Sequence, residues 1–372
     1  MKILYIANVR LPTEKAHGVQ IMKSCEAFAL LGHNLKLIVP QRHSPIKEDA
    51  CAYYGLKICL PITRLFTIDT IGWCAVGYVF ESVVFGLSTC LHIWRHLADV
   101  IYGRDEIVLA LIGLLTNKKI IWESHDGAWN VWARYVARRA SGMVVVTNGA
   151  VDFYKEHGVP KQKLLAVSNG IDLDDFANPE SKEAARVRLG LPQHEKIALY
   201  IGRLDGWKGV DTLLQASKIL QNIKVAVIGG EIGQIEKLSP QYPHVHFLGF
   251  RPYRELAHNQ VAGDVLVVPN TGKNEISARF TSPLKLIAHL ASGRPVVVSD
   301  LPSTRSIADG TALFVLPDDS YALAAGIKQL INDPKRAHEL AEAGKAKATQ
   351  FSWSKRAERI TAFLTGDVER VK

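Results

Sequence analysis

The sequence has little of what marks several specialised protein classes. Its 372 residues include only five cysteines and no Cys-x-x-Cys pair, so neither a zinc site nor a disulfide framework is indicated. No G-x-G-x-x-G segment follows the first apolar run, which argues against a dehydrogenase that transfers hydride. No basic run is interleaved with aromatic residues, and no nucleic-acid-binding motif is present. We therefore expect no nucleic-acid partner.

The cysteines and the N-terminal segment indicate where the protein works. The cysteine number is odd, which fits reduced thiols packed as small hydrophobic side chains in a reducing compartment. The opening residues, MKILYIANVR, resemble a short buried strand, with no long apolar run or cleavage site behind them. We expect no secretory signal and a cytoplasmic location. The cysteines are Cys25, Cys51, Cys59, Cys74 and Cys90.

Composition and charge describe an ordinary folded protein with a basic surface. Apolar residues make up 48% and charged residues 22% of the chain, which excludes a disordered or collagen-like protein. The formal net charge is +9. Because the basic residues are scattered among acidic ones, a small molecule that carries phosphate fits better than a nucleic acid. The length favours two domains.

Short β-branched runs alternate with helix-length segments along the whole chain. Runs that are apolar on both faces are typical of a parallel sheet covered by helices on both sides. The pattern restarts after a polar segment with two prolines at residues 173–195. It therefore predicts an α/β fold with two parallel-sheet domains facing a cleft, because ligands bind at the carboxyl ends of parallel strands. The runs are residues 2–8, 35–40, 99–103, 118–124, 142–147, 164–170, 196–202, 223–230, 244–249, 264–269, 294–299 and 312–316.

One segment, residues 71–93, is almost entirely apolar and carries a single charge at Glu81. It is long enough to span a bilayer. A spanning helix would, however, place two parts of one sheet on opposite sides of a membrane. We therefore expect a helix that is buried or lies along a membrane surface, where Trp73, Trp94 and Arg95 at its ends would contact lipid.

The segment at residues 200–216, YIGRLDGWKGVDTLLQA, predicts an anion site. A strand ends at Gly202, Arg203 and Lys208 flank a tight turn, and Gly209 opens a helix. Free N–H groups at a helix N-terminus add to the charge of nearby cations. The alternative is a solvated loop whose charges bind nothing.

A second anion site of the same kind is predicted at Thr281-Ser282-Pro283-Leu284-Lys285. Ser282 is expected to cap the helix, with Pro283 at its first position and a stop at Ser292-Gly293. Simple helix capping is the alternative. Two such helix starts at strand ends are what a diphosphate would use. Gly18 and Val19 form a third, weaker phosphate loop, where glycine would let a ligand approach the backbone.

These segments resemble the GT-B glycosyltransferases, and within them the retaining family 4 (group 1). The resemblance covers nearly the whole chain and implies two Rossmann-like domains. It is carried by PTEKAHGVQIMKSCEAFALLG near the start, WESHD and SNGID in the middle, and GRLDGWKGVDTLLQA, HFLGFRPYREL, SPLKLIAHLASGRPVVVSDLPS and FSWSKRAERITAFL in the second half.

The resemblance also implies the domain boundaries. An N-terminal acceptor-side domain would span residues 1–176, followed by a linker at 177–195. A nucleotide-sugar-binding domain would span 196–350. Residues 351–372 would form a terminal helix that crosses back to the first domain.

The resemblance implies a role for each matching residue. Arg203 and Lys208 would neutralise the donor diphosphate as the glycosidic bond breaks. With these cations and helix N-termini supplying charge, no metal ion or other cofactor is expected. His125 would lie near the sugar, although a structural histidine at a strand end is the alternative. The further donor contacts would come from the backbone at Gly18, Val19, Gly202, Phe250 and Arg251 and from Thr281, Ser282, Pro283, Leu284 and Lys285.

The sequence departs from the family pattern in the donor helix. The family has two glutamates, the second of which binds the donor ribose, but Phe280 and Ala288 occupy those positions. A lost hydrogen bond to a charged acceptor costs about 1.5–3 kcal/mol. Glu275 or His289 could replace the ribose contact. Glu275 could equally be a solvated loop charge.

The expected activity is the transfer of a sugar from a nucleotide-diphosphate sugar to an acceptor hydroxyl, with retention of configuration. The acceptor would be a glycan or a lipid-linked glycan in the assembly of a surface polysaccharide or glycolipid. If the acceptor is a lipid, we expect attachment to the inner membrane face.

Two alternatives remain open at this point. A nucleotide-sugar-binding protein of the same fold without activity is favoured by Ala288 and opposed by Arg203 and Lys208. A nucleotide-sugar epimerase would need acid and base residues, and the sequence shows no carboxylate cluster that would supply them.

Overall fold

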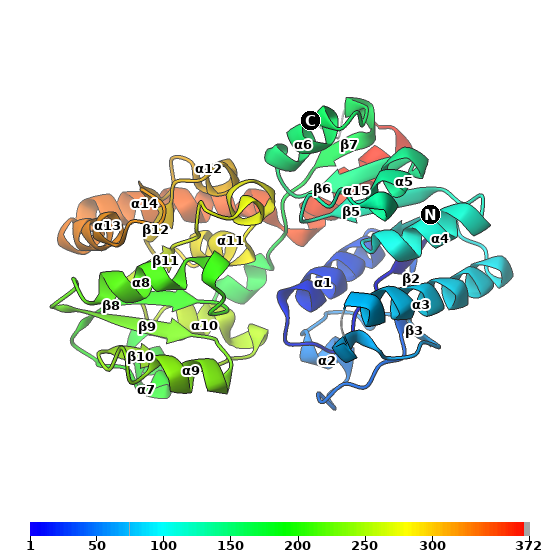
Figure 1. Ribbon diagram of the computed structural model, residues 1–372. Helices are drawn as coiled ribbons and strands as arrows, with labels where there is room; N and C mark the ends of the chain where they lie inside the picture. The colour runs from blue at the N-terminus through cyan, green and yellow to red at the C-terminus, as the bar shows by residue number, and fades with distance from the viewer. Residues whose placement is uncertain (74, 368–372) are drawn as a thin grey trace. The chain divides into compact units, whose positions relative to one another are not determined.

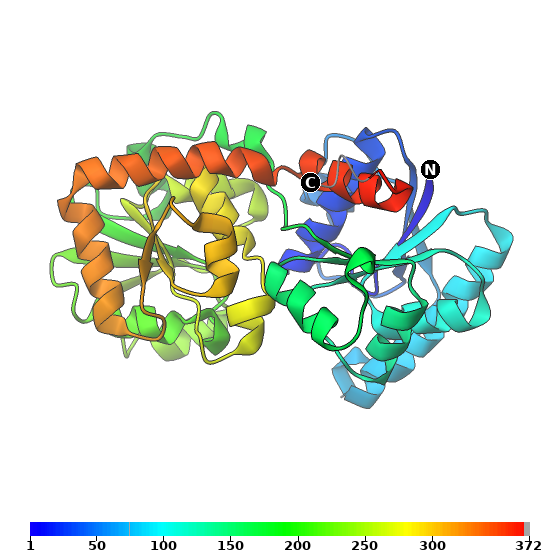
Figure 2. The same cartoon turned by 90° about the horizontal axis from the view of Figure 1, so that it is seen from above.

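The protein divides into two compact units, each built on one parallel sheet (Figures 1 and 2). The structure, a computed structural model, describes residues 1–73 and 75–367. The first unit comprises Met1–Ser168 together with the chain from Trp353 onward, and the second comprises Asn169–Ser352. This confirms the predicted α/β class with two parallel-sheet domains. Cys74 and the last residues of the predicted terminal helix, 368–372, lie outside the described residues.

The sheet of the first unit has seven parallel strands in the order β3-β2-β1-β4-β5-β6-β7. Tyr5 of β1 pairs with Leu37 on one side and Tyr102 on the other. The strands that follow β1 are added on one side of it up to β3, and those from β4 onward on the other side, so the strand order reverses between β1 and β4. Ligands bind at such switch points. The strands are β1 (Lys2–Ile6), β2 (Asn34–Pro40), β3 (Ile62–Leu65), β4 (Val100–Gly103), β5 (Ile120–Ser124), β6 (Gly142–Val145) and β7 (Leu164–Ala166).

Helices cover this sheet, and several of them begin at a side-chain cap. Asp105, Asn130 and Thr147 each accept a hydrogen bond from backbone N–H groups of the helix that follows. The chain returns to this unit for its last helix, α15, where the His33 Nε2 and Thr361 Oγ1 atoms lie 2.9 Å apart. The helices are α1 (Ala16–Leu30), α2 (Ala50–Tyr53), α3 (Ala75–Arg95), α4 (Glu106–Leu115), α5 (Val131–Arg139), α6 (Asn148–Glu156) and α15 (Trp353–Thr365).

The sheet of the second unit has six parallel strands in the order β10-β9-β8-β11-β12-β13. Its central strands are buried on both faces, as the continuous apolar runs predict. The strands are β8 (Lys196–Ile201), β9 (Ile223–Ile228), β10 (Val245–Phe247), β11 (Val265–Val268), β12 (Val296–Ser299) and β13 (Leu313–Val315). The helices are α7 (Lys182–Leu189), α8 (Val210–Ser217), α9 (Ile232–Leu238), α10 (Leu256–Gln260), α11 (Leu284–Ala291), α12 (Pro302–Ala308), α13 (Ser320–Asn332) and α14 (Pro334–Ala348).

The predicted linker at residues 177–195 belongs instead to the second unit. Its helix α7 starts at the Ser181 cap and ends at Gly190, which has φ +66°. Ala185 and Leu189 are buried in the core of the second unit. Arg186 is also buried, and its guanidinium contacts Asp264 at 2.8 Å. The polar surface of this segment concealed an amphipathic helix, and the linker prediction was wrong for that reason.

The apolar segment at residues 71–93 forms most of α3, a surface helix of the first unit that packs against α4. Within the described residues, α3 is the one helix long and apolar enough to cross a membrane by length and composition. Glu81, the single charge of residues 71–93, is buried and lies 2.5 Å from the Arg42 guanidinium. Tyr78 also donates a hydrogen bond to Asp105. These polar contacts attach the helix to the unit.

Candidate functional site

The end of β8 forms a narrow turn in the second unit. A Cβ atom on Gly202, which has φ +153°, would lie only 2.4 Å from the Lys285 Nζ atom. Gly209, with φ +71°, precedes α8, and a Cβ there would lie 1.7 Å from the Pro269 carbonyl oxygen. Both positions favour glycine because their φ angles are positive, and at Gly209 the Pro269 backbone also leaves no room for a side chain. The backbone at the start of α8 therefore lies directly against the end of β11.

Arg203 and Lys208 lie on this turn. Arg203 is 59% exposed, and its Nε atom lies 3.0 Å from Asp205 Oδ2. The Lys208 ammonium lies over the Trp207 ring, 3.3 Å from its centre. Burial, and then the charge of Arg203, lower the pKa of Lys208 to about 8, against the effect of Asp205. A lysine with a lowered pKa beside an arginine is a site that an anion would stabilise.

The second predicted anion site meets the first at Lys285. Its Nζ atom, near the start of α11, donates a hydrogen bond to the Tyr200 hydroxyl at 2.8 Å. Tyr200 in turn donates to the Arg203 carbonyl oxygen at 2.6 Å. Burial and the nearby Lys208 hold the pKa of Lys285 well below its usual value. The structure therefore brings two segments about 80 residues apart to one cationic site at the carboxyl end of β8.

The start of α11 differs in detail from the prediction. The helix runs from Leu284, and Pro283, whose carbonyl accepts the first helical hydrogen bonds, is the cap. Ser282 does not cap it: the Ser282 hydroxyl accepts a hydrogen bond from the Asn169 backbone N–H at 3.1 Å. Asn169 also donates to the Ser282 carbonyl at 2.9 Å. Thr281 donates to the Ile276 carbonyl at 2.8 Å. These serine and threonine hydroxyls bind the protein's own backbone.

The predicted base loop joins the end of β9. The Gly229 N–H donates to the Gly249 carbonyl at 2.8 Å, next to Phe250 and Arg251. The Phe250 side chain is 48% exposed. Gly229 itself would carry a Cβ only 2.1 Å from the Gly202 carbonyl oxygen. The loop is therefore tied through Gly229 to the turn that bears the cations, while the role of its backbone in holding a base stays a prediction.

The two side chains suggested as ribose contacts have opposite environments. Glu275 is exposed, and its carboxylate lies 3.1 Å from the Arg279 guanidinium. His289 is fully buried, its Nδ1 lies 3.1 Å from Gln260 Nε2, and burial lowers its pKa to about 3. Ala288 is part of the apolar core, and Phe280 is buried. Of the two, Glu275 has the access that a ribose hydroxyl needs, and both roles stay predictions.

Asn270, which follows β11, was not predicted as a site residue. Its side chain is fully buried, and neither its oxygen nor its nitrogen has a hydrogen-bond partner. Buried amides without partners are rare in folded proteins. A Cβ at Gly209 would lie 3.2 Å from the Asn270 carbonyl carbon, so Asn270 is beside the start of α8. No sequence pattern singles it out, because its neighbourhood arises only when β8 and β11 pair.

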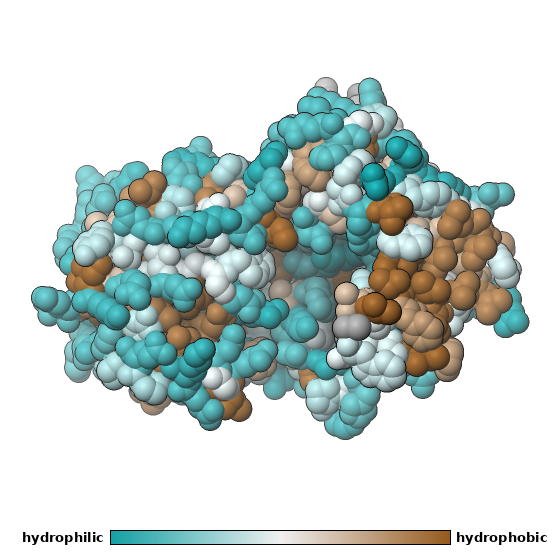
Figure 3. Space-filling view, viewed as in Figure 1, coloured by the Kyte–Doolittle hydropathy of each residue, from teal (hydrophilic) through white to brown (hydrophobic). Residues whose placement is uncertain are grey.

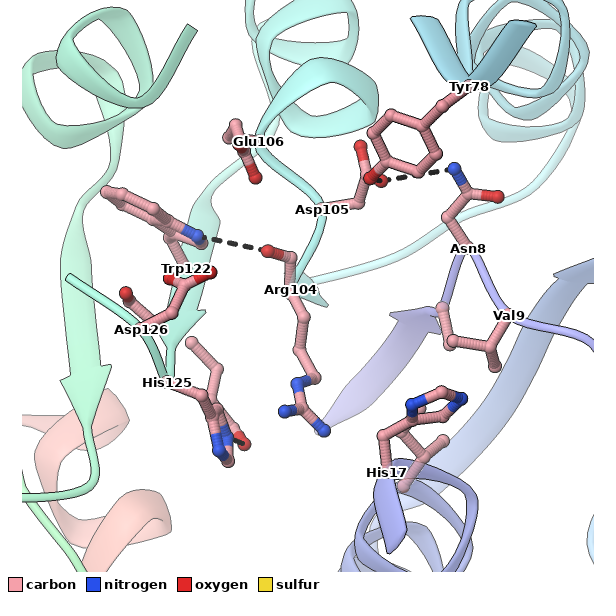
Figure 4. Close-up of a pocket in the computed structure, with 14 residues that line it drawn as sticks. Asn8, Val9, His17, Tyr78, Arg104, Asp105, Glu106, Trp122, His125 and Asp126 are labelled. Carbon is pink, nitrogen blue, oxygen red and sulfur yellow. Dashed lines mark hydrogen bonds and ion pairs between the residues drawn. The ribbon is translucent and has the colours of Figure 1, made fainter. Parts of the chain in front are cut away.

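The first unit contains a cavity of about 310 Å³ at the carboxyl ends of β1, β4 and β5. Figure 4 shows the Arg104 side chain extending into it between those of His17 and His125. The cavity is lined by Ala7, Asn8, Val9, His17, Ile21, Tyr78, Arg104, Asp105, Glu106, Trp122, Glu123, Ser124, His125 and Asp126.

His125 belongs to a buried charge network. Its Nε2 atom lies 2.5 Å from Glu123 Oε1, and the same oxygen lies 3.1 Å from the Arg356 guanidinium of α15. Tyr102 donates a hydrogen bond to the other Glu123 oxygen. Burial, and then Arg104, lower the pKa of His125 to about 4, so the ring is neutral near pH 7. The contact with a carboxylate places the imidazole proton on Nε2 and leaves Nδ1 as an acceptor.

Glu123 itself is held in its charged form. Burial acts to raise its pKa, but Arg356 and the hydrogen bond with His125 outweigh burial and hold the pKa well below its usual value. Glu123 and Arg356 are 2% and 3% exposed, respectively. The sequence marked His125 and predicted that the terminal helix containing Arg356 crosses back to the first domain, but it did not single out Arg356, which lies more than 200 residues from His125 along the chain.

The cavity also gathers four carboxylates, which corrects the expectation that no carboxylate cluster exists. Asp105 caps α4 and accepts hydrogen bonds from Tyr78 at 2.5 Å and Asn8 at 3.1 Å. Burial raises the pKa of Glu106. Glu123 and Asp126 complete the group. The cluster was not visible in the sequence because it forms only when the ends of β4 and β5 lie side by side.

Gly18 and Val19 lie in the first turn of α1. A Cβ at Gly18 would lie 2.2 Å from the Tyr54 hydroxyl, so Tyr54 occupies the space expected for a ligand. That hydroxyl accepts from the Thr13 N–H and donates to the Thr13 carbonyl, both at 2.8 Å. Gly18 is therefore needed for packing, and the predicted phosphate contact of this turn stays a prediction.

Among residues 1–73 and 75–367, no three His, Cys, Asp or Glu side chains are grouped to hold a metal ion.

Comparisons with known proteins agree with these features. Residues 195–333 match the family model described as Glycosyl transferases group 1. A D-inositol 3-phosphate glycosyltransferase from Corynebacterium aurimucosum is 30% identical over 234 residues, which cover 56% of this chain and 52% of that relative. One from Streptomyces avermitilis is 29% identical over 249 residues, covering 60% and 52%. The chain spans about half the length of the curated relatives it matches.

Solved structures match over nearly the full length. Sucrose-phosphate synthase from Thermosynechococcus elongatus has a TM-score of 0.80 at 19% identity, covering 100% of both chains. HepE from Anabaena in complex with UDP-glucose has a TM-score of 0.77 at 16% identity, covering 98% of this chain and 100% of that one. The protein has the fold of the GT-B glycosyltransferases, and its residues 195–333 match the glycosyl transferases group 1 model. The predicted resemblance to the GT-B glycosyltransferases of group 1 is confirmed, and the narrower assignment to the retaining family 4 stays a prediction.

Proposed function

We propose that the protein is a glycosyltransferase that moves a hexose from a nucleotide-diphosphate sugar to an acceptor hydroxyl, with retention of configuration. The observation that carries this proposal is the cationic site made by Arg203, Lys208 and Lys285 at the end of β8. It belongs to the domain that matches the glycosyl transferases group 1 model, and HepE, of similar fold, was solved with UDP-glucose.

Charge stabilisation is the main task of this site. As the bond between the sugar and the diphosphate breaks, negative charge grows on the leaving nucleotide. The guanidinium and the two ammonium groups stabilise that charge, together with the N–H groups at the start of α8. We propose that these groups suffice without a metal ion, so a chelator should leave the rate unchanged.

The cavity of the first unit is proposed to bind the acceptor. Carboxylates accept hydrogen bonds from sugar hydroxyls, and Trp122 and Tyr78 supply aromatic surface beside them. The neutral His125 offers a bare Nδ1 atom that can accept a hydroxyl proton. A polyhydroxy acceptor, such as the sugar of a growing glycan, fits this lining.

A membrane surface is proposed to carry that acceptor, with the protein attached on the cytoplasmic side. Apolar residues of α3 recur at intervals of three to four and so share one face. Figure 3 shows apolar side chains gathered over this helix. Between Val76 and Trp94 this face carries no charge, because Glu81 is buried, and Trp73 and Trp94 are 79% and 62% exposed at its ends. The apolar residues on the face are Val76, Phe80, Val83, Val84, Leu87, Leu91 and Trp94.

Charge supports a lipid partner for this face. Arg95, the last residue of α3, is exposed, and the net charge of the chain is +9. An amphipathic helix with flanking cations binds anionic lipid surfaces.

Vesicle flotation tests the membrane proposal. The protein should float with vesicles of phosphatidylethanolamine and phosphatidylglycerol, and Phe80→Glu/Leu87→Glu should remain in the soluble fraction. Val187→Glu, at an exposed apolar position of α7, is the matched control. Equal flotation of the α3 variant would reject a role for this face. If the α3 variant differs from the wild type in oligomeric state but floats equally well, the apolar face of α3 binds a second copy of the chain instead of lipid.

Nucleotide binding and turnover test the activity. UDP should raise the melting temperature, and Arg203→Ala/Lys208→Ala should abolish that shift. Lys218→Ala, at the opposite end of α8, should keep it. Panels of GDP, ADP and CMP and of their sugars then identify the donor. If the protein binds a nucleotide but does not consume the corresponding nucleotide sugar with any acceptor of a panel, it is a nucleotide-sugar-binding protein without transferase activity.

A nucleotide-sugar epimerase is the second candidate, and the carboxylate cluster of the cavity is the observation that favours it. Acid and base groups such as Glu106 and Asp126 could move a proton on a sugar carbon. Product analysis separates the two functions. An epimerase converts the donor alone, whereas a transferase needs an acceptor.

A further inference from the structure

Two thiols of the first unit lie close together. The Sγ atoms of Cys51 and Cys59 are 3.2 Å apart, although eight residues separate them in the chain. Cys51 is buried in α2, and the Leu60 N–H points to its sulfur at 3.4 Å. Cys59 is exposed. The odd cysteine number predicts thiols packed as small hydrophobic side chains, and Cys59 does not fit that prediction.

We propose that Cys51 and Cys59 are a redox modification site that forms a reversible disulfide when the protein meets a peroxide. A disulfide has an S–S distance of about 2.05 Å, so closing the pair requires the sulfurs to approach by about 1 Å. Rotation of the exposed Cys59 side chain can supply a movement of this size. The pairing is intramolecular and needs no second copy of the chain.

The reaction proceeds in two balanced steps. The Cys59 thiolate attacks one peroxide oxygen, the O–O bond breaks, and Cys59 becomes a sulfenic acid as hydroxide leaves. The Cys51 sulfur then attacks the Cys59 sulfur, the S–S bond forms, and the oxygen leaves as water with the Cys51 proton. The two thiols lose two electrons and two protons, and hydrogen peroxide is reduced to two waters. A dithiol reductant reverses the reaction by exchange.

The environments of the two thiols set their order of reaction. Burial, and to a smaller extent the neighbouring Cys59, raise the pKa of Cys51 to about 11, so Cys51 stays protonated near pH 7. The thiolate is the reactive form, and access controls its oxidation. The exposed Cys59 is therefore the residue that meets the oxidant, and Cys51 is the residue that resolves the sulfenic acid.

The disulfide would affect the turn before α1. Tyr54, three residues after Cys51, holds the Thr13 backbone and fills the space above Gly18. Gly55, next along, accepts a hydrogen bond from Lys23 of α1 at 2.8 Å. A cross-link from Cys51 to Cys59 closes the loop that carries these contacts and restricts its freedom. We expect the oxidised protein to melt at a higher temperature than the reduced protein.

A peptide map of the full-length protein tests the proposal directly. After treatment with hydrogen peroxide and alkylation of the remaining thiols, the protein is digested with trypsin without reduction. Lys57 lies between the two cysteines, so cleavage at Lys47, Lys57 and Arg64 gives peptides 48–57 and 58–64. These peptides should stay linked in the oxidised wild type and separate on addition of dithiothreitol.

Variants and a second probe complete the test. Cys59→Ser, at an exposed position, should abolish the linked peptides and the rise in melting temperature, and Cys90→Ala should keep both. Phenylarsine oxide, which bridges two neighbouring thiols, should bind the reduced wild type but not Cys59→Ser. The proposal is overturned if peroxide takes Cys59 to sulfinic acid while Cys51 remains free to alkylate, or if Cys59 pairs only with a second copy.

Discussion

Lysines 208 and 285 hold two ammonium groups at the end of one strand, with Arg203 beside them. Burial is the main cause of the lowered pKa values of both lysines, and a neighbouring cation adds to it: Arg203 for Lys208, and Lys208 for Lys285. The fold therefore keeps these cations where an anion can relieve their repulsion. In the first unit, by contrast, the buried charge of Glu123 is already compensated by the Arg356 guanidinium.

Nucleotide binding should depend on pH through Lys208. Below its pKa of about 8 the lysine is protonated and attracts the diphosphate. Above that pH the free protein must take up a proton to bind, so affinity should fall by up to about tenfold per pH unit. Titration calorimetry of UDP from about pH 7 to about pH 9.5, in buffers of different ionisation enthalpy, measures both effects. Lys208→Arg should flatten the profile, and an unchanged slope in that variant would reject Lys208 as the titrating group.

Stability should depend on pH through His125. Its pKa is about 6.5 in an unfolded chain and about 4 in the folded protein. The contribution of neutral His125 to the free energy of unfolding is therefore complete above pH 6.5 and is lost as pH falls toward 4. Over this range the free energy of unfolding falls by about 1.4 kcal/mol per pH unit. Urea unfolding across this range should show the slope in the wild type and a shallower one in His125→Asn. Parallel profiles for the two proteins would contradict the low pKa.

At the scale of elements, apolar periodicity predicted the strands well because both sheets are covered on both faces. Every predicted run contains a strand, from Lys2–Ile6 to Leu313–Val315. The strand β3, Ile62–Leu65, was missed because it lies at the edge of its sheet, is only partly buried, and carries the exposed Arg64. Helix α7 was missed because its exposed face made the segment resemble a linker.

The turn at Gly209 should tolerate no side chain. Gly209→Ala places a Cβ in the left-handed region and against the Pro269 carbonyl, and backbone strain alone costs about 1–3 kcal/mol. We expect a lower melting temperature and loss of the UDP shift. Gly233→Ala, within α9 and without neighbours around its Cβ, is the matched control and should be neutral or slightly stabilising. A Gly209→Ala protein that melts and binds like the wild type would contradict the described turn.

At the scale of the whole molecule, the first unit is discontinuous, because its last helix follows the complete second unit. The contact between Arg356 and Glu123 joins the two pieces inside the cavity wall. The sequence could place single motifs such as WESHD, but it could not show that Arg356 and Asp105 lie near WESHD in the first unit. Nor could it show that Asn270 lies beside Gly209 in the second unit. Those neighbours depend on strand order and on long-range packing, which leave no local pattern.

Removing one partner of this pair should be costly. Arg356→Met leaves the Glu123 carboxylate buried with its main counter-charge gone, and we expect the first unit to lose about 3–5 kcal/mol. Glu123→Gln/Arg356→Met should recover much of that loss because no unpaired charge remains. Hydrogen exchange resolved by peptide measures the two units separately. Equal loss in the single and double variants would show that the side-chain volume of Arg356 matters more than its charge.

The position of α15 has a consequence for synthesis on the ribosome. Arg356 is translated after both sheets. Until then, the Glu123 carboxylate, which contacts His125, lacks the counter-charge of Arg356. The second unit, Asn169–Ser352, is continuous and can complete its core first. The cavity that we assign to the acceptor is therefore the last part of the molecule to be completed, and a chain released early would carry a finished cationic site together with an unfinished acceptor pocket.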